Sequence, residues 1–189
     1  MKKLNKKGFT LVELLAVIVI LAVVMLIAVT AVGPLMTKAR KSALGTEGVG
    51  MVNAAKTAYQ TEQLSGKVGP TDSACFDLEW LCNSNYFEKG CTSGGDGYYG
   101  SVLATYSSGK LTYKFWLSNG SYTFGGVGTG LTNGIDPAKF DVEDTTNTVT
   151  DGTITAANKT KIKACGKTPS SNKISGWTYC SKAGNGCLK

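Results

Sequence analysis

The chain of 189 residues contains no histidine. Imidazole is the commonest general base in enzymes and a frequent metal ligand, so its absence excludes Ser-His and Cys-His catalysis and histidine-built metal sites. The phosphate-binding pattern G-x-x-x-x-G-K followed by Ser or Thr is also missing. The glycine-rich stretch 125–130 lacks the strand-and-helix context of a phosphate cradle, and we interpret it as a flexible loop. We therefore expect no enzymatic activity, no cofactor and no metal.

One apolar run dominates the amino-terminal part, because residues 14–33 contain a single polar side chain, Thr30. As a helix, these 20 residues would be about 30 Å long, which matches the hydrocarbon core of a bilayer. A secretory signal is shorter and ends in a small-residue cleavage site, which is lacking here, so we expect the run to persist in the mature protein. Positive charge is greater before the run than after it, which predicts a cytoplasmic amino terminus.

The segment before this run reads Lys-Gly-Phe-Thr-Leu-Val-Glu and places one carboxylate, that of Glu13, at its edge. A charge costs about 2.5–3.5 kcal/mol at the centre of a spanning helix and less near its ends. Glu13 is therefore expected to need a cationic partner. The string resembles the class III signal of type IV pilins and pseudopilins, over residues 1 to 35 of this chain.

The resemblance implies a role for three residues. A prepilin peptidase would remove residues 1–8 by cutting between Gly8 and Phe9, and would then methylate the amino group of Phe9. Glu13 would pair with the Phe9 ammonium of a neighbouring subunit. Independently of the resemblance, a helix macrodipole favours an anion in the first turn, and a buried carboxylate needs a partner. The alternative is a plain single-pass anchor whose glutamate reaches the membrane interface.

The helical pattern continues after the apolar run. We expect residues 9–34 to form a membrane-spanning helix that becomes the core of a filament, and residues 35–65 to form its amphipathic second half. Glycines 45, 48 and 50 weaken this half by about 0.8–1 kcal/mol each relative to alanine, or allow close packing. Many members of the family carry a proline near position 30. Here the Gly33-Pro34 pair comes later, and we expect a kink near residues 29–33.

Residues 66–189 are expected to form a globular head with strands. Residues 111–117 alternate between Leu, Tyr, Phe, Leu on one face and Thr, Lys, Trp on the other, which predicts a strand. Residues 98–106 are a candidate partner strand, Asn119-Gly120 a tight turn, and Asp151-Gly152 the turn of a further hairpin. The sequence thus predicts an α+β fold, in which a long helix packs on a small antiparallel sheet whose other face is polar, as in type IV pilins.

The cysteines all lie in this head. An even number in an exported, loop-rich domain predicts a disulfide framework, and six cysteines allow 15 pairings, which stay open. We expect the pairs to form within or between two clusters, one before the sheet and one near the carboxy terminus. Zinc is the alternative, although the usual Cys-x2–4-Cys spacing is missing. The six residues are Cys75, Cys82, Cys91, Cys165, Cys180 and Cys187.

Charge is segregated along the head. Of the formal net charge of +7, four lysines belong to residues 1–8, and without them 16 basic residues oppose 13 acidic ones. Residues 136–151 hold five acids and one lysine, whereas residues 159–189 hold seven lysines and no acid. The basic tail is either a solvated surface that pairs with the acidic stretch or a binding face for phosphate polymers, DNA or wall polymers.

The resemblance implies a structural subunit that polymerises through its amino-terminal helix into a type IV pilus-like surface filament. Its expected partners are copies of itself, prepilin peptidase, the pilus assembly platform proteins and the membrane. It would lie in the cytoplasmic membrane as a single-pass protein before assembly, and in a cell-surface filament afterwards. Two alternatives stay open. One is a pseudopilin of a type II secretion or competence DNA-uptake system, and the other is a minor pilin or adhesin whose head binds DNA or a host surface.

Overall fold

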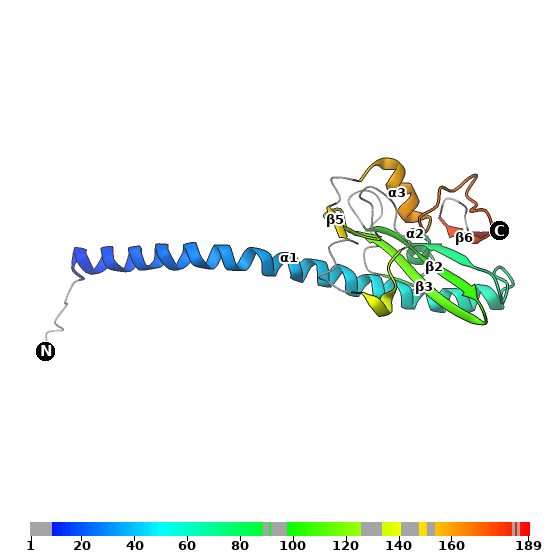
Figure 1. Cartoon of the computed structure of the whole chain (residues 1–189), viewed down its shortest axis with the longest axis horizontal. Coiled ribbons are helices and arrows are strands. Elements are labelled where there is room, and N and C mark those ends of the chain that lie inside the picture. Colours follow the sequence, from blue (N-terminus) through cyan, green and yellow to red (C-terminus); the bar gives the residue numbers. More distant parts are fainter. Residues whose placement is uncertain are drawn as a thin grey trace, which may run out of the picture. The chain divides into compact units, whose positions relative to one another are not determined.

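The chain divides into two compact units, residues 1–40 and 41–189, and one helix, α1 (Leu11–Leu64), runs through both (Figure 1). The expected leader, including Gly8 of the cleavage site, lies outside the described residues. The computed structural model describes residues 9–88, 91, 98–125, 134–140, 148–150, 154–182, 184 and 186–189.

Helix α1 ends where the sequence predicts. Gly66 adopts a φ of +76°, which is the left-handed conformation that stops a helix. The N–H of Lys67 donates to the carbonyl of Glu62 at 2.9 Å, and the N–H of Gly66 donates to the carbonyl of Gln63 at 3.1 Å. These two bonds form a Schellman motif, which satisfies the last carbonyl groups of the helix.

The Gly33-Pro34 pair does not interrupt α1, which is helical on both sides of Pro34. Proline has no N–H and leaves the carbonyl of residue 30 without its usual donor. Two threonines near this site donate hydrogen bonds from their hydroxyl groups to carbonyl groups of the same helix. Thr30 Oγ1 donates to the carbonyl of Ile27 at 2.9 Å, and Thr37 Oγ1 donates to that of Gly33 at 3.2 Å. The kink near residues 29–33 stays a prediction.

The described strands form one seven-stranded sheet with the order β5-β4-β3-β2-β1-β6-β7. The sheet is mixed rather than antiparallel as expected, because β1 and β6 are parallel while the other pairs are antiparallel. Parallel neighbours need a long crossover, and most of the head lies between β1 and β6. The strands are β1 (Ala74–Asp77), β2 (Tyr99–Ser107), β3 (Lys110–Ser118), β4 (Tyr122–Phe124), β5 (Thr148–Thr150), β6 (Thr178–Ser181) and β7 (Gly186–Leu188).

Among the described residues, three short helices accompany the sheet: α2 (Leu78–Asn83), the 3-10 helix η1 (Pro137–Lys139) and α3 (Ala156–Lys163). The β2–β3 hairpin and the Asn119-Gly120 turn are confirmed. Asn119 Oδ1 accepts the N–H of Tyr122 at 2.9 Å, and Gly120 has a φ of +79°. The expected hairpin around Asp151-Gly152, whose turn lies outside the described residues, is wrong. Strand β5 pairs with β4, and Thr155 caps α3 by accepting the N–H of Asn158 at 3.3 Å.

One face of the sheet packs on α1 within the unit 41–189. The alternation in β3 holds, since Phe115 and Leu117 join this core while Trp116 points to the other face. Two helix glycines make the contact possible. A Cβ at Gly48 would overlap the ring of Phe115, and a Cβ at Gly45 would overlap the ring of Phe140. The glycines therefore allow the sheet to approach α1 closely, which compensates for their low helix propensity.

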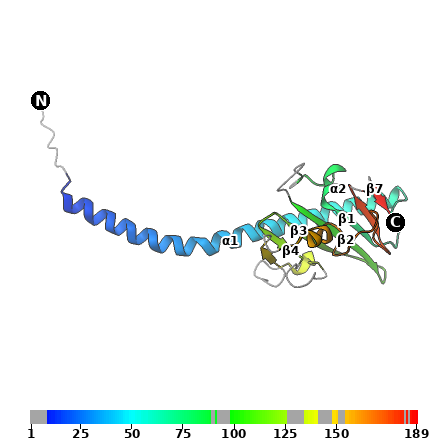
Figure 2. The same cartoon turned by 90° about the horizontal axis from the view of Figure 1, so that it is seen from above.

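The opposite face of the sheet is not polar as expected, because α3 and the chain that follows it cover it (Figure 2). Trp116, Leu103 and Cys75 form a second core there with Ile162 and Tyr179. The alternation in β2 and β3 predicts the face that packs on the first core. No local pattern in those strands predicts that a later segment covers the second face of the sheet.

Candidate functional site

The beginning of α1 brings Thr10 and Glu13 together. The backbone N–H of Thr10 donates to Glu13 Oε2 at 2.8 Å, and the hydroxyl of Thr10 donates to the same oxygen at 2.8 Å. In return, the backbone N–H of Glu13 donates to Thr10 Oγ1 at 3.3 Å. The first i→i−4 bond, from the N–H of Leu14 to the carbonyl of Thr10, is 3.2 Å long. Thr10 is therefore the N-cap of α1, and the reciprocal bonds form a capping box.

The capping box fixes the carboxylate of Glu13 at the positive end of the helix dipole. Both bonds from Thr10 reach Oε2, and Oε1 accepts no hydrogen bond from the described residues. Of the sequence-derived site residues, Phe9 is 84% exposed and Glu13 is also exposed. Sequence reasoning missed Thr10, although the T-x-x-E spacing before an apolar run is the signature of a capping box.

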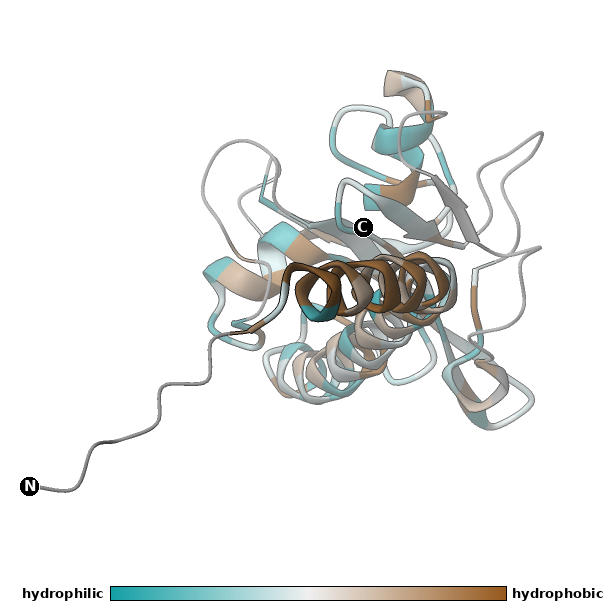
Figure 3. Cartoon of the chain, turned by 90° about the vertical axis from the view of Figure 1, so that its left-hand side faces the viewer, coloured by the Kyte–Doolittle hydropathy of each residue, from teal (hydrophilic) through white to brown (hydrophobic). Residues whose placement is uncertain are grey.

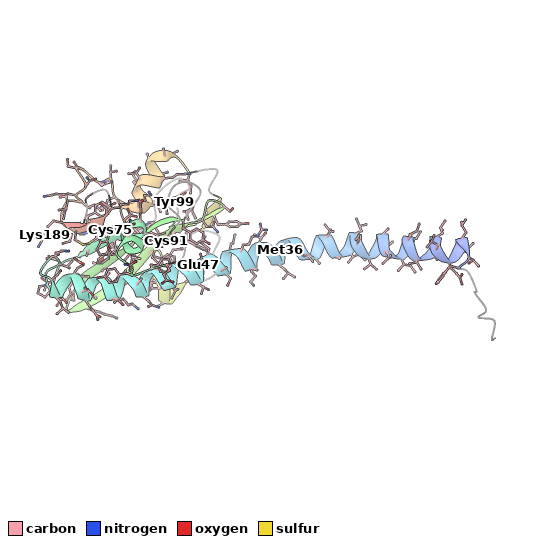
Figure 4. All side chains as sticks on the ribbon, turned by 180° about the vertical axis from the view of Figure 1, so that it is seen from behind. Met36, Glu47, Cys75, Cys91, Tyr99 and Lys189 are labelled. Carbon is pink, nitrogen blue, oxygen red and sulfur yellow. A yellow bond between two sulfur atoms is a disulfide. The ribbon has the colours of Figure 1, made fainter. Side chains whose placement is uncertain are left out.

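Behind this cap, the residues of α1 up to Met36 are mostly apolar (Figure 3). Every large apolar side chain from Phe9 to Met36 is exposed, and the side chains project from all sides of the helix (Figure 4). By length and composition, α1 can cross a membrane. Because the hydroxyls of Thr30 and Thr37 bond to the backbone of the helix itself, they do not need partners outside it.

The predicted disulfide framework is confirmed, and the structure supplies the pairing that the sequence left open. One bridge closes a short segment in each cluster, and the third links the two clusters across 90 positions of sequence, from β1 to the residues after α3. Within the described ranges no group of three or more metal-ligating side chains occurs. The pairs are Cys75–Cys165, Cys82–Cys91 and Cys180–Cys187.

The head also buries carboxyl groups, and that of Asp77 is one of them. Asp77 ends β1 and caps α2, where its Oδ1 accepts the N–H of Glu79 at 3.2 Å. The residue is only 5% exposed, and this burial raises the pKa of Asp77 to about 7. The neighbouring Glu79 behaves in the opposite way. Its hydrogen bond from Lys182 Nζ, 2.8 Å long, lowers the pKa of Glu79.

Comparison with known protein families identifies the amino-terminal segment. Residues 3–29 match the family model described as "Prokaryotic N-terminal methylation motif". This motif is the class III signal of type IV pilins and pseudopilins, so the resemblance inferred from the Gly-Phe-Thr-Leu-Val-Glu string is confirmed. The matched segment contains Thr10, Glu13 and the apolar run of α1. Neither the curated proteins nor the solved structures include a match to the chain.

Proposed function

We propose that this protein is a structural subunit of a type IV pilus-like surface filament. The prepilin peptidase would cut it between Gly8 and Phe9 and methylate Phe9, and the mature subunit would polymerise through its amino-terminal helix. In this proposal the protein catalyses nothing and is itself the substrate of the peptidase. The methylation motif supports a pilin-type or pseudopilin-type subunit, and it supports membrane anchoring together with the apolar helix.

The observation that carries the proposal is the exposed apolar surface of α1 between Phe9 and Met36. Moving one large apolar side chain out of water contributes about 1.5–3 kcal/mol, so the whole surface has to leave water. A membrane removes it from water before assembly. A bundle of identical helices does the same afterwards, so one surface serves both states of the subunit.

The capping box explains how Glu13 can take part in both states. Its charge is held at the helix terminus by Thr10, which lowers the cost of placing it beside the membrane core. Oε1 has no partner among the described residues and is the atom to which a neighbouring Phe9 ammonium would donate. Pairing with this ammonium would neutralise a carboxylate that is otherwise left bare in an apolar core.

The test is made in the native cell, with Glu13→Ala and the matched control Glu88→Ala, an exposed glutamate of the head. Intact mass should give a mature chain that begins at methylated Phe9 in the wild type and in both variants. Immuno-electron microscopy with an antibody to the head should show filaments for the wild type and Glu88→Ala, and few or none for Glu13→Ala.

Three outcomes would contradict parts of the proposal. An uncut chain that begins at Met1 would overturn the processing. Normal filaments of Glu13→Ala would overturn the pairing role of Glu13. Processed chains that stay in the envelope and support secretion or DNA uptake without a surface filament would identify a pseudopilin instead, and labelling confined to filament tips would identify a minor pilin.

A further inference from the structure

Strand β7 forms one edge of the sheet and pairs with a single described strand, β6. The pairing covers three residues on each strand, and the middle partners are Cys180 and Cys187, which also form a disulfide. All three residues of β7 are half-buried. A short edge strand gains few contacts from its sheet, so the Cys180–Cys187 bridge is a major part of what holds β7 in place.

A surface ion pair also holds the chain directly after β7. Lys189 Nζ lies 2.7 Å from Asp72 Oδ2, in the segment that follows α1. The lysine side chain is exposed, and such ion pairs contribute little because water and salt screen them. Ordering the backbone of β7 costs conformational entropy, which this ion pair and a three-residue ladder have to offset. Without the bridge, we expect β7 to detach readily from β6.

The two cysteines of this bridge differ in accessibility. Cys180 is fully buried in the first core, whereas Cys187 is half-buried and packs against that core from the edge strand. An external thiolate therefore reaches Cys187 more readily than Cys180. The Cys75–Cys165 bridge offers no such approach, because both of its cysteines are buried in the second core. Exposed disulfides are in general the more easily reduced ones.

The position of the bridge in the ladder also favours reduction. Cys180 and Cys187 face each other directly in an antiparallel pair. The Cα atoms of facing residues in such a pair are about 4.5–5.5 Å apart, whereas a disulfide most often joins Cα atoms about 5.5–6 Å apart. The ladder and the bridge thus favour different spacings, which makes a disulfide easier to reduce. The Cys82–Cys91 bridge leaves the end of α2 and joins no facing strand residues.

We propose that the Cys180–Cys187 bridge is a redox switch: an external dithiol reduces it selectively and thereby releases β7 from the edge of the sheet. The partner belongs to the class of protein dithiols that carry out thiol–disulfide exchange. The rest of the sheet stays folded, because Cys75–Cys165 still links β1 to the segment after α3. Release leaves backbone N–H and C=O groups of β6 unpaired, so the reduced head presents a sheet edge that the oxidised head covers.

The exchange takes place in two steps. A thiolate of the reductant attacks Sγ of the accessible Cys187 and forms a mixed disulfide with it, while Cys180 leaves as a thiolate and takes up a proton. The second thiol of the reductant then loses its proton and attacks the reductant's own sulfur in the mixed disulfide. Cys187 leaves as a thiolate and is protonated in turn. The head has gained two electrons and two protons, and the reductant has become a disulfide.

The experiment treats the full-length, unprocessed chain, in a non-ionic detergent and without denaturant, with rising concentrations of dithiothreitol. Free thiols are then alkylated, and peptide mapping by mass spectrometry identifies the labelled cysteines. Cys180 and Cys187 should be labelled at the lowest concentration, whereas Cys75 and Cys165 should stay unlabelled until denaturant is added. Amide hydrogen exchange of the same samples should show a loss of protection in β7, while β1, β2 and β3 keep theirs.

Two double variants separate the effect of this bridge from the loss of any short bridge. Cys180→Ala with Cys187→Ala should remove the protection of β7 even without dithiothreitol. The matched control, Cys82→Ala with Cys91→Ala, removes a bridge of similar span and should leave β7 protected. The dithiothreitol series uses the wild type alone, so it decides the question even if the first variant does not fold.

Selective labelling of Cys180 and Cys187, together with a loss of protection confined to the β6–β7 edge, supports the switch. Reduction of all three bridges at the same concentration, or earlier reduction of either other bridge, would overturn the proposed selectivity. Unchanged protection of β7 after its bridge has opened would overturn the release of the strand. These results concern the head alone, so the proposed assembly into a filament does not depend on them.

Discussion

At the scale of single residues, Thr10 and Glu13 show how a charge is tolerated at the edge of an apolar helix. The carboxylate is bound by its own helix cap through two bonds to Oε2. In the proposed pairing Thr10 would be a positioning residue, because it engages Oε2 and leaves Oε1 without a partner among the described residues. The role can be separated from that of Glu13, since Thr10 contributes a hydroxyl and a backbone N–H but no charge.

Replacing Thr10 by valine keeps the shape of the side chain and removes the hydroxyl. The loss of an N-cap typically costs about 1 kcal/mol, which corresponds to about a fivefold loss in an assembly equilibrium. We expect Thr10→Val to be cut normally but to yield several-fold less filament, and Thr10→Ser to restore it. Intact mass reports the cleavage and quantitative immunoblots of sheared filaments report the assembly. Equal filament yields for the valine and serine variants would contradict the positioning role.

Asp77 gives the head a pH-dependent stability whose sign follows from its environment. Its folded pKa of about 7 lies above the ordinary value of 3.8, so the folded state binds the proton more tightly than the unfolded state. Its contribution to stability is therefore complete below about pH 4, is lost as the pH rises to about 7 and stays lost above that pH. The loss amounts to about 4 kcal/mol at most, because one pKa unit corresponds to about 1.4 kcal/mol.

Asp77→Asn should remove this loss, since asparagine is neutral and can still cap α2. We expect the variant to unfold at nearly the same temperature as the wild type near pH 4 and at a clearly higher one at pH 8. Near-ultraviolet circular dichroism of the detergent-solubilised chain measures both. A constant difference between variant and wild type across this range would show that burial does not raise the pKa.

These two sites differ in how visible they are in the sequence. The T-x-x-E spacing of Thr10 and Glu13 is local, so the capping box can be recognised from the amino-acid sequence alone. Asp77 carries no such signal. Its burial depends on β2 and β6, which flank β1 in the sheet and come from distant parts of the chain. A pKa shift that arises from tertiary burial cannot be inferred from neighbours in sequence.

At the scale of elements, the second half of α1 is shaped by what packs against it. Helix propensity alone predicts that replacing any of its glycines by alanine stabilises the helix by about 0.8–1 kcal/mol. The structure divides these glycines into two kinds. A Cβ at Gly48 would overlap the ring of Phe115, whereas a Cβ at Gly50 would lie 3.5 Å from Phe87, an ordinary contact.

Gly48→Ala should therefore destabilise the head, because overpacking costs about 1–3 kcal/mol and exceeds the gain in propensity. Gly50→Ala is the matched control and should be neutral or stabilising by up to about 1 kcal/mol. Thermal unfolding of the two variants under identical conditions decides the matter. If both alanines raised the unfolding temperature, Phe115 would not need the space at Gly48.

The strands illustrate the same division between local and distant information. The alternation of residues 111–117 predicts β3 and its two faces, because a strand has a period of two residues. The sequence did not predict the parallel β1–β6 pair or the second core around Trp116. Both depend on the return of residues 154–181 across the sheet, and no local pattern in β1 or β3 encodes that return.

At the scale of the whole molecule, the two units differ in how their apolar side chains are removed from water. In the first unit every large apolar side chain from Leu14 to Met36 is exposed, and this surface has to be removed from water. Residues 41–189 bury two cores of their own, one on each face of the sheet. The residues that bury these two cores all lie in this second unit, so the cores form without the apolar surface of the first.

The Cys75–Cys165 bridge is expected to contribute strongly to the stability of the head. It joins β1 to the segment after α3 across 90 positions of sequence, whereas Cys82–Cys91 spans only nine. In the chain-entropy view, a longer closed loop restrains the unfolded chain more strongly. Both cysteines of the long bridge are also buried in the second core. The bridge therefore links the sheet to the segment after α3 that covers it.

Removing the long bridge with Cys75→Ala and Cys165→Ala should cost about 4–5 kcal/mol, and removing the short one with Cys82→Ala and Cys91→Ala about 3 kcal/mol. Denaturant unfolding of the two double variants, monitored by tryptophan fluorescence, measures the difference. Trp116 lies in the second core next to the long bridge, so its signal should be lost first in the Cys75/Cys165 variant. A larger loss of stability on removing the short bridge would contradict this prediction, because loop length would then not decide which bridge stabilises the head more.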